Sequence, residues 1–289
     1  MSIPMDTYCM QCYLRRNIDL ARTLGSEAEA ADFARDIMRL LLDAPKDAPS
    51  PYLGPEVADL LLARYGLEID RYRQEKIDSN RFVLAHMEEI RSRVRRAEDP
   101  LYAGLQYAIL GNYLDFSALQ GQVEFGTLEA MLDKGEEMAL DKDCFREFCR
   151  ELETGKELLY LTDNAGEIGF DRIFAEEIAR RYPHLTITFC VRGDIAANDA
   201  TREDAAVVGL SFPVIDNGNR VAGTVPELLG EEARQAMERA DVILAKGMGN
   251  AETLYGCGKN IYYAFLVKCQ RFVTLFQKPL MTPMFLKEK

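Results

Sequence analysis

The chain has 289 residues, of which 48% are hydrophobic and 28% charged, and its formal net charge is −12. These proportions are typical of a folded protein with a sizeable core. The negative charge argues against nonspecific binding to nucleic acid, because such binders need clustered lysine and arginine. The sequence has no apolar run of 18 residues and no secretion signal, so we expect a cytoplasmic protein without a membrane segment.

Cysteine and histidine are sparse. Seven cysteines, an odd number, indicate reduced thiols more than a disulfide framework. Cys9 and Cys12 can be half of a zinc site, a redox pair or two buried thiols, and the sequence leaves these alternatives open. With only two histidines, neither a histidine-rich zinc site nor a Ser-His-Asp triad is expected. Chemistry is expected to depend on carboxylates, amides and lysines.

The first half of the chain is predicted to be helical. Ser26 and Glu29 form a capping box, Gly25 and Gly66 end helices, and prolines at 45–51 indicate an extended loop. We predict a helical bundle or cap domain over residues 1–153, with helices at 10–24, 26–43, 55–65, 70–96 and 100–108.

From residue 156 onward, short β-rich runs alternate with helical patterns. The predicted strands are 158–162, 186–191, 213–216, 242–245 and 272–275, and the predicted helices are 167–182, 201–209, 226–239 and 259–269. Such alternation favours a parallel sheet covered on both faces. We therefore predict an α/β fold in which residues 154–289 form a Rossmann-like three-layer sheet domain that carries the functional site, beside the N-terminal helical domain.

Polar side chains follow three of these strands. Asp163 and Asn164 come after the first strand, and Asp199 lies beyond the second. Carboxyl ends of parallel strands meet at one edge of a sheet, where ligands bind. Two carboxylates and an amide oxygen suit Mg²⁺ or Mn²⁺ and leave positions for a substrate phosphate. Each pair alone is a common turn or helix cap, but their concurrence favours a metal site.

The third strand end carries a lysine between an apolar run and glycines. Lys246 can meet a phosphate as a point charge, while the backbone N–H groups of Gly247 and Gly249 approach it closely. The other interpretation is a turn with a solvated lysine. Together with the carboxylates, this segment favours a combined phosphate and metal site.

Four segments resemble the damage-control phosphatases, a family originally catalogued as domain of unknown function 89. They are DNAGEI at 163–168, NDAT at 198–201, DVILAKGMGN at 241–250 and GNYLDF at 111–116. The resemblance covers nearly the whole chain. Cys9-x-x-Cys12 and the pair Lys268-Cys269 also resemble the smaller, prokaryote-type branch of this family.

The resemblance implies a helical domain beside a Rossmann-like domain, and a divalent metal held by Asp163, Asn164 and Asp199. The implied cofactor is Mn²⁺, Mg²⁺, Ni²⁺ or Co²⁺. The implied activity is metal-dependent hydrolysis of phosphate monoesters of small metabolites, either sugar phosphates or damaged phosphometabolites.

Together with Asn164 as a metal ligand, these expectations assign roles to eleven residues. Asp163, Asp199, Lys246 and Glu167 are the candidate catalytic residues, with Glu167 or Asp199 as proton acceptor. The candidate substrate contacts are Asn112, Asp115, Gly247, Gly249, Asn250 and Lys268. Asn112 can instead belong to a helix C-cap at Gly111, and Lys268 can be an ordinary lysine at a helix end.

Two attack mechanisms are open from the sequence. Asp163 could attack phosphorus, but aspartyl-phosphate phosphatases place a second aspartate two residues after the nucleophile, and Ala165 stands there. We therefore favour attack by a metal-bound water molecule over a covalent intermediate.

The alternatives for function are a carboxylate-directed transferase with a nucleotide-type cofactor and a non-catalytic metal-binding regulatory protein. The transferase is disfavoured because this sequence has no Gly-x-Gly-x-x-Gly motif after the first strand. The sequence leaves the substrate, the native metal and the oligomeric state open.

Overall fold

The computed structural model describes residues 2–116, 118–119 and 123–288. Within this part, twelve α-helices accompany one sheet of six strands. None of the described helices is both long and apolar enough to cross a membrane. The helices are α1 Thr7–Leu24, α2 Glu27–Asp43, α3 Gly54–Tyr65, α4 Arg73–Arg96, α5 Pro100–Gly111, α6 Phe125–Leu132, α7 Lys142–Thr154, α8 Glu167–Arg181, α9 Arg202–Val207, α10 Glu231–Arg239, α11 Gly247–Leu254 and α12 Gln270–Phe276. The strands are β1 Glu157–Leu161, β2 Thr186–Val191, β3 Val214–Asp216, β4 Val242–Lys246, β5 Ile261–Leu266 and β6 Pro283–Lys287.

The sheet has the strand order β3-β2-β1-β4-β5-β6. Every neighbouring pair is parallel except β5 and β6, which are antiparallel. The chain moves from β1 to β2 on one side and later reaches β4 on the other, so the strand order reverses between β1 and β4. Open α/β sheets bind their ligands at such a reversal. The predicted Rossmann-like architecture is confirmed.

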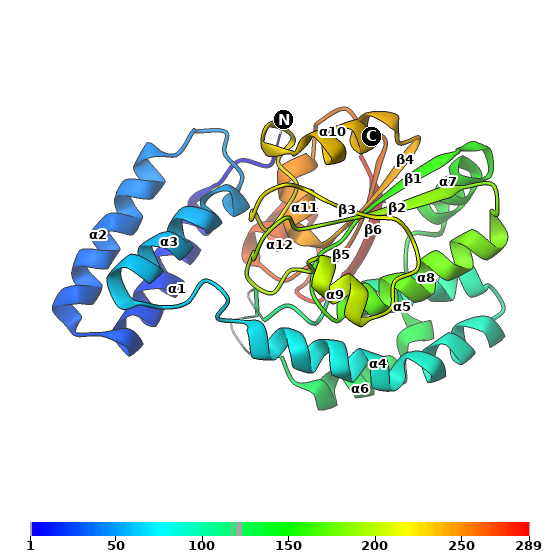
Figure 1. Ribbon diagram of the computed structural model, residues 1–289, viewed down its shortest axis with the longest axis horizontal. Coiled ribbons are helices and arrows are strands. Elements are labelled where there is room, and N and C mark those ends of the chain that lie inside the picture. Colours follow the sequence, from blue (N-terminus) through cyan, green and yellow to red (C-terminus); the bar gives the residue numbers. More distant parts are fainter. Residues whose placement is uncertain (1, 117, 120–122, 289) are drawn as a thin grey trace.

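Helices cover both faces of the sheet, as Figure 1 shows with α4, α5 and α8 on one side and α10 and α11 on the other. Alternate residues of β1 serve the two faces. Leu158 and Tyr160 belong to the apolar core shared with α4, α5 and α8. Leu159 and Leu161 belong to the core shared with α10, α11 and α12. The sheet is therefore the middle of three layers, and its polar groups are accessible mainly at the strand ends.

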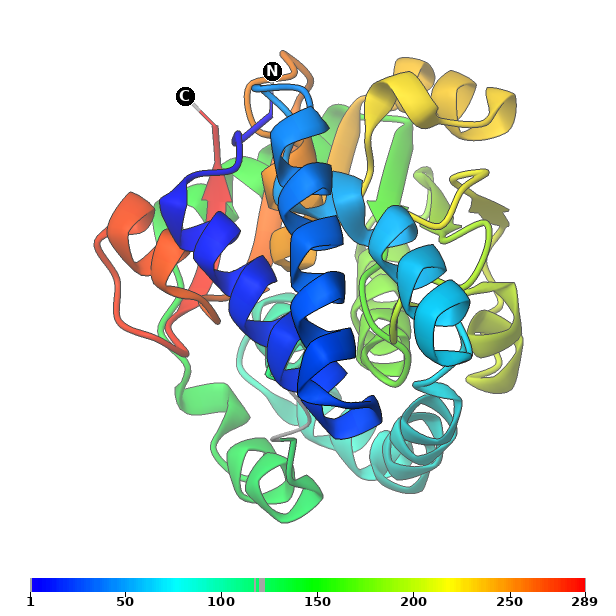
Figure 2. The same ribbon diagram turned by 90° about the vertical axis from the view of Figure 1, so that its left-hand side faces the viewer.

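The N-terminal helices divide into two groups. Helices α1 to α3 pack around their own small core, which includes Phe33, Ile37 and Leu61. They lie at one end of the molecule, in front in Figure 2. Helices α4 to α7 instead share the large core of the sheet, through residues such as Tyr107 and Phe148. The division into domains at residue 153 stays a prediction, because these later helices pack directly on the sheet layer.

Two predicted elements near the C-terminus are wrong. Residues 259–269 were expected to be helical, but Ile261–Leu266 is strand β5, and the predicted strand at 272–275 lies in helix α12. All six residues of β5 are buried, so the strand reads as a continuous apolar run without alternation. Such a run does not distinguish a buried strand from a buried helix. The strand β6 was not predicted, and it extends the sheet beyond β5.

Candidate active site

The polar pair after β1 lies at the carboxyl edge of the sheet, beside the reversal of strand order. Asp163 Oδ2 accepts hydrogen bonds from Nδ2 of Asn164 at 2.8 Å and from Nδ2 of Asn112 at 2.9 Å. Only 6% of Asp163 and 1% of Asn164 is exposed. The end of β1 therefore holds a carboxylate that is almost removed from water.

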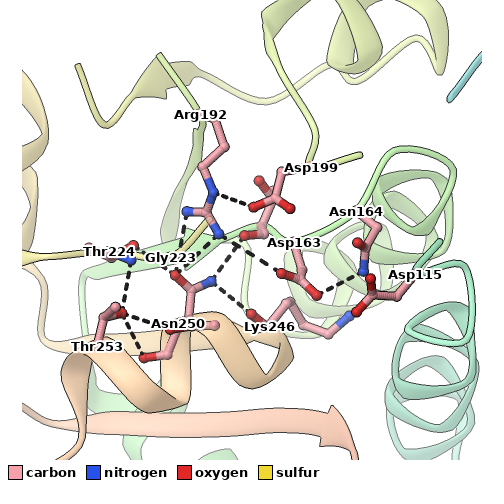
Figure 3. A network of polar contacts seen from close by, with 12 residues as sticks. Asp115, Asp163, Asn164, Arg192, Asp199, Gly223, Thr224, Lys246, Asn250 and Thr253 are labelled. Carbon is pink, nitrogen blue, oxygen red and sulfur yellow. Dashed lines mark hydrogen bonds and ion pairs between the residues drawn. The ribbon is translucent and has the colours of Figure 1, made fainter. Parts of the chain in front are cut away.

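The segment after β2 brings Asp199 beside this pair. The backbone N–H of Ala200 donates to the carbonyl oxygen of Asp163 at 2.7 Å, and Asn198 Nδ2 donates to Asn164 Oδ1 at 2.8 Å. Asn164 and Asp199 also form an isolated antiparallel bridge. The structure thus brings together the three predicted metal ligands, and Figure 3 shows their side chains in one cluster.

Glu167, on the first turn of α8, directs its fully buried carboxylate toward the same cluster. It accepts hydrogen bonds from Asn112 Nδ2 at 2.9 Å, from Asn164 Nδ2 at 2.7 Å and from Lys246 Nζ at 2.7 Å. A carboxylate with several donors is held in one orientation. That suits a group that must accept a proton at a defined place.

Lys246, the last residue of β4, is fully buried. Its ammonium lies 2.7 Å from Glu167 Oε1, 2.6 Å from Asp171 Oδ1 and 2.8 Å from the carbonyl oxygen of Ala108. An ammonium has three donors, and these three acceptors use all of them. The expected contact between Lys246 and a phosphate does not fit this arrangement. Lys246 instead joins the sheet to α5 and α8.

Burial alone would lower the pKa of Lys246, but Asp171 and Glu167 outweigh it and raise the pKa, so the side chain carries a positive charge. Burial raises the pKa of Asp171 to about 7, although Lys246 lowers it. Tyr160 also donates to Asp171 Oδ1 at 2.8 Å. The lysine is therefore the counter-charge of two buried acids.

Asn112 comes from the end of α5, far from the other site residues in sequence, and it is completely buried. Its Oδ1 accepts the backbone N–H of Leu266 at 3.0 Å, while its Nδ2 reaches Asp163 and Glu167. The approach depends on Gly111, because a Cβ there would lie 2.5 Å from the ring of Phe170 on α8. Close packing of α5 on α8 thus delivers Asn112 to the site.

Asp115 and Lys268 form a second polar pair at the site. Lys268 Nζ lies 2.8 Å from Asp115 Oδ2, and the lysine side chain is buried. Its charge lowers the pKa of Asp163, whereas Asp115 raises it, so both groups act on the carboxylate cluster. Lys268 has one charged partner among the described residues, whereas Lys246 has two.

The segment after β4 contributes through its backbone. Gly247 has φ +78°, and a Cβ there would lie 2.0 Å from Asp163 Oδ2, so only glycine lets the chain pass this close. A Cβ at Gly249 would lie 2.2 Å from the carbonyl oxygen of Ala222, so Gly249 serves packing on that neighbouring loop. Asn250 Nδ2 donates to the carbonyl oxygens of Thr162 and Lys246, at 3.0 and 2.7 Å. Asn250 therefore acts as a brace between β1 and β4.

Arg192, directly after β2, was missed by the sequence reasoning. Only 1% of it is exposed, and its Nε donates to Asp199 Oδ2 at 2.6 Å. Its Nη2 lies 3.9 Å from Asp163 Oδ1 (Figure 3). The available signal was position, because Arg192 follows a predicted strand at the same edge as Asp163 and Lys246.

Five carboxylates and three cations meet in this cluster of described residues. Ionisation of all eight groups leaves two negative charges in excess, because five negative charges face three positive ones. Burial raises the pKa of Asp163 well above its usual range, and Asp199 and Glu167 raise it further. Burial also raises the pKa of Asp199 to about 6, although Arg192 lowers it. The carboxylates are Asp115, Asp163, Glu167, Asp171 and Asp199, and the cations are Arg192, Lys246 and Lys268.

A divalent cation fits this cluster, because it would offset the two excess negative charges. Among the described residues, the hydrogen bonds of Asp163 and Asp199 given above use Oδ2, so each carboxylate has Oδ1 left for an ion. Among the residues that the structure describes, no group of three His, Cys, Asp or Glu side chains is placed to hold a metal. A metal site at this edge therefore needs the amide oxygen of Asn164 as well as the two carboxylates.

The Cys9 and Cys12 pair lies outside this cluster, on α1. Both thiols are free, and burial raises the pKa of Cys9 to about 12, which makes it a poor nucleophile. Within the described ranges, no cluster of three His, Cys, Asp or Glu side chains completes a zinc site there. Cys9 is buried and Cys12 is half-buried, so burial describes the first thiol only.

Comparison with known proteins places the chain in a family. The sequence matches the Damage-control phosphatase ARMT1-like domain over residues 5–282. A protein of Archaeoglobus fulgidus named damage-control phosphatase is 35% identical over 273 residues, which cover 91% of each chain. An uncharacterized protein of Methanocaldococcus jannaschii is 29% identical over 280 residues, covering 93% of this chain and 90% of that one.

A solved structure has the same fold. The crystal structure of a DUF89 family protein from Pyrococcus horikoshii superposes with a TM-score of 0.83, covers 99% of both chains and is 24% identical. The resemblance inferred from the sequence motifs is therefore confirmed for the family and for the fold. The family match across residues 5–282 and the identity to the Archaeoglobus fulgidus protein show that this chain belongs to the damage-control phosphatase ARMT1-like family.

Proposed function

We propose that this protein is a metal-dependent phosphatase that hydrolyses phosphate monoesters of small metabolites, either sugar phosphates or damaged phosphometabolites. Family membership supports the phosphatase class. The observation that carries the proposal is the meeting of Asp163, Asn164 and Asp199 at the carboxyl edge of the sheet, in a cluster with two excess negative charges. Such a cluster needs a cation before it can approach a phosphate.

Asp163, Asn164 and Asp199 would hold the cation, and Mg²⁺, Mn²⁺, Co²⁺ and Ni²⁺ all accept such ligands. When bound, the ion would offset the negative charge of the phosphoryl oxygens as the ester bond breaks. Glu167 is the best-placed proton acceptor, because Asn112, Asn164 and Lys246 hold its carboxylate beside Asp163. Asn112 is thus assigned to orienting these two acids.

Lys268 is the better candidate for a phosphate contact than Lys246. Its ammonium has one charged partner among the described residues, Asp115, and so keeps donors for a substrate oxygen. Its influence on the pKa of Asp163 places its charge close to the proposed metal ligands. In this assignment Asp115 holds Lys268 in place through their ion pair, and Lys246 holds Glu167 in place through another.

Hydrolysis of p-nitrophenyl phosphate with each of the four metals tests the proposal. Asp163→Asn and Asp199→Asn should each reduce metal-stimulated turnover by at least roughly a hundredfold, because each removes a charged metal ligand. Asp216→Asn is the matched control. Asp216 ends β3 at the same edge of the sheet but pairs with Arg202, so its loss should change turnover by less than about threefold.

Turnover that needs no metal, or that survives both ligand substitutions, would contradict the proposal. The same experiment separates the two alternatives from it. A non-catalytic regulatory protein would bind the metal without hydrolysing the ester. A carboxylate-directed transferase with a nucleotide-type cofactor would leave p-nitrophenyl phosphate intact.

A further inference from the structure

Arg192 is one of the largest side chains that the structure buries completely. Its guanidinium lies behind the two carboxylates that the proposed function assigns to the metal. Nε donates to Asp199 Oδ2 at 2.6 Å, and Nη2 lies 3.9 Å from Asp163 Oδ1. A single cation therefore touches one proposed ligand and faces the other.

The guanidinium is held from its far side. Nη1 and Nη2 each lie 3.4 Å from Asn250 Oδ1, which also accepts from Thr224 Oγ1 at 2.8 Å. Asn250 is itself fixed by two backbone carbonyl oxygens at the ends of β1 and β4, as described above. Figure 3 shows this chain of contacts running from Thr224 through Asn250 and Arg192 to Asp199. The position of Asp199 is thereby tied to the central strands.

The contact selects which oxygen of Asp199 remains for an ion. Because Nε occupies Oδ2, rotation of the carboxylate is restricted, and Oδ1 is the oxygen that remains for an ion. Carboxylates that bind metals commonly need such a hydrogen-bond partner to fix their orientation. The three proposed metal ligands do not by themselves account for this orientation of Asp199, which depends on Arg192.

We propose that Arg192 is a positioning residue that orients Asp199 for a divalent cation. It links that ligand to Asn250, which is hydrogen-bonded to the ends of β1 and β4. The proposal rests on the metal site of the proposed function. A positioning role and a role in charge balance alone predict opposite changes in metal affinity when Arg192 is replaced. A positive charge next to a bound cation repels it, so removal of a simple counter-charge would tighten metal binding. Removal of a positioning group would weaken it.

Calorimetric titration of the purified full chain with MnCl₂ measures this sign directly. Arg192→Met should weaken Mn²⁺ binding by about 10- to 100-fold, the range found for partners of metal ligands. Arg192→Lys keeps the charge but cannot reach both Asp199 and Asn250, so its affinity should fall between the two. Arg202→Met is the matched control, since Arg202 binds Asp216 at the same edge and touches no proposed ligand; its affinity should equal that of the wild type.

Thermal unfolding in a chelator establishes that each variant is folded before titration. If Arg192→Met fails to fold, Arg192→Lys alone decides the question. Wild-type affinity, or tighter binding, in a folded Arg192 variant would overturn the positioning role while leaving the proposed function intact. Absence of Mn²⁺ binding by the wild-type protein would instead refute the metal site itself.

Discussion

Replacement of Lys246 by methionine tests the interpretation of that lysine as a buried counter-charge. The ammonium is fully buried against Glu167 and Asp171, at 2.7 and 2.6 Å. Without it, two buried acids lose their only cation among the described partners. Removal of one partner from a buried ion pair costs about 3–5 kcal/mol in free energy of unfolding. We expect Lys246→Met to fall in that range.

Urea denaturation in the presence of a chelator measures the effect without a contribution from bound metal. Lys287→Met is the matched control: Lys287 also pairs with two glutamates, Glu147 and Glu151, but near the surface, so its loss should cost at most about 1 kcal/mol. Adding Asp171→Asn to Lys246→Met should recover part of the loss, because one of the two uncompensated charges is removed. A loss below about 1 kcal/mol for Lys246→Met would refute the reasoning.

Three further predictions follow from the same geometry. Gly247→Ala should lower the free energy of unfolding by at least about 2 kcal/mol, because of its positive φ and the overlap with Asp163; an unchanged urea midpoint would contradict this. Burial raises the pKa of Asp199 to about 6 and of Asp171 to about 7, so the metal-free protein should lose stability as pH rises from about 4 to 7; a melting temperature that rises across this window would be evidence against it. Mn²⁺ should reduce this loss by binding the ionised form. Lys268→Ala should raise KM for p-nitrophenyl phosphate roughly tenfold without weakening calorimetric Mn²⁺ binding, because it removes a charged hydrogen bond to the substrate and not a metal ligand; an unchanged KM would remove Lys268 from the phosphate.

The meeting of Asp163, Asn164 and Asp199 could be predicted because strand ends obey a simple geometric rule. Asp163 and Asn164 follow β1 and Asp199 follows β2, and parallel neighbours end at the same edge of the sheet. Three polar segments each follow an apolar run that forms a strand, and this order along the chain was sufficient to predict that the segments meet at one edge of the sheet. The fold class followed from the same alternation of strands and helices.

The directions of individual side chains could not be predicted in this way. Lys246 and Gly247 are adjacent, yet the lysine turns into the core between α5 and α8 while the glycine passes under Asp163. Alternation along a strand assigns a residue to one of two faces, but it does not say which helix covers that face. The contacts of Lys246 depend on acids in α8 that only the packed layers bring near.

The exchanged assignments of β5 and α12 have a related cause. Ile261–Leu266 is buried on both faces because it lies inside a covered sheet, so its sequence lacks the alternation that marks a strand. Phe272 and Val273 favour a strand by intrinsic preference, yet they lie in a helix that packs its apolar side against β5. Tertiary packing outweighed local preference in both segments.

The sequence by itself determined the family, the layered fold and the polar residues at the sheet edge, because these depend on local order along the chain. Only the tertiary structure decided that Arg192 supports Asp199, that Asn112 reaches the site from α5, and that Lys246 is spent on Glu167 and Asp171. These contacts join segments far apart in the chain. Close packing and the need to compensate buried charge determine which residues make these contacts. The spacing of residues along the chain does not reveal either of them.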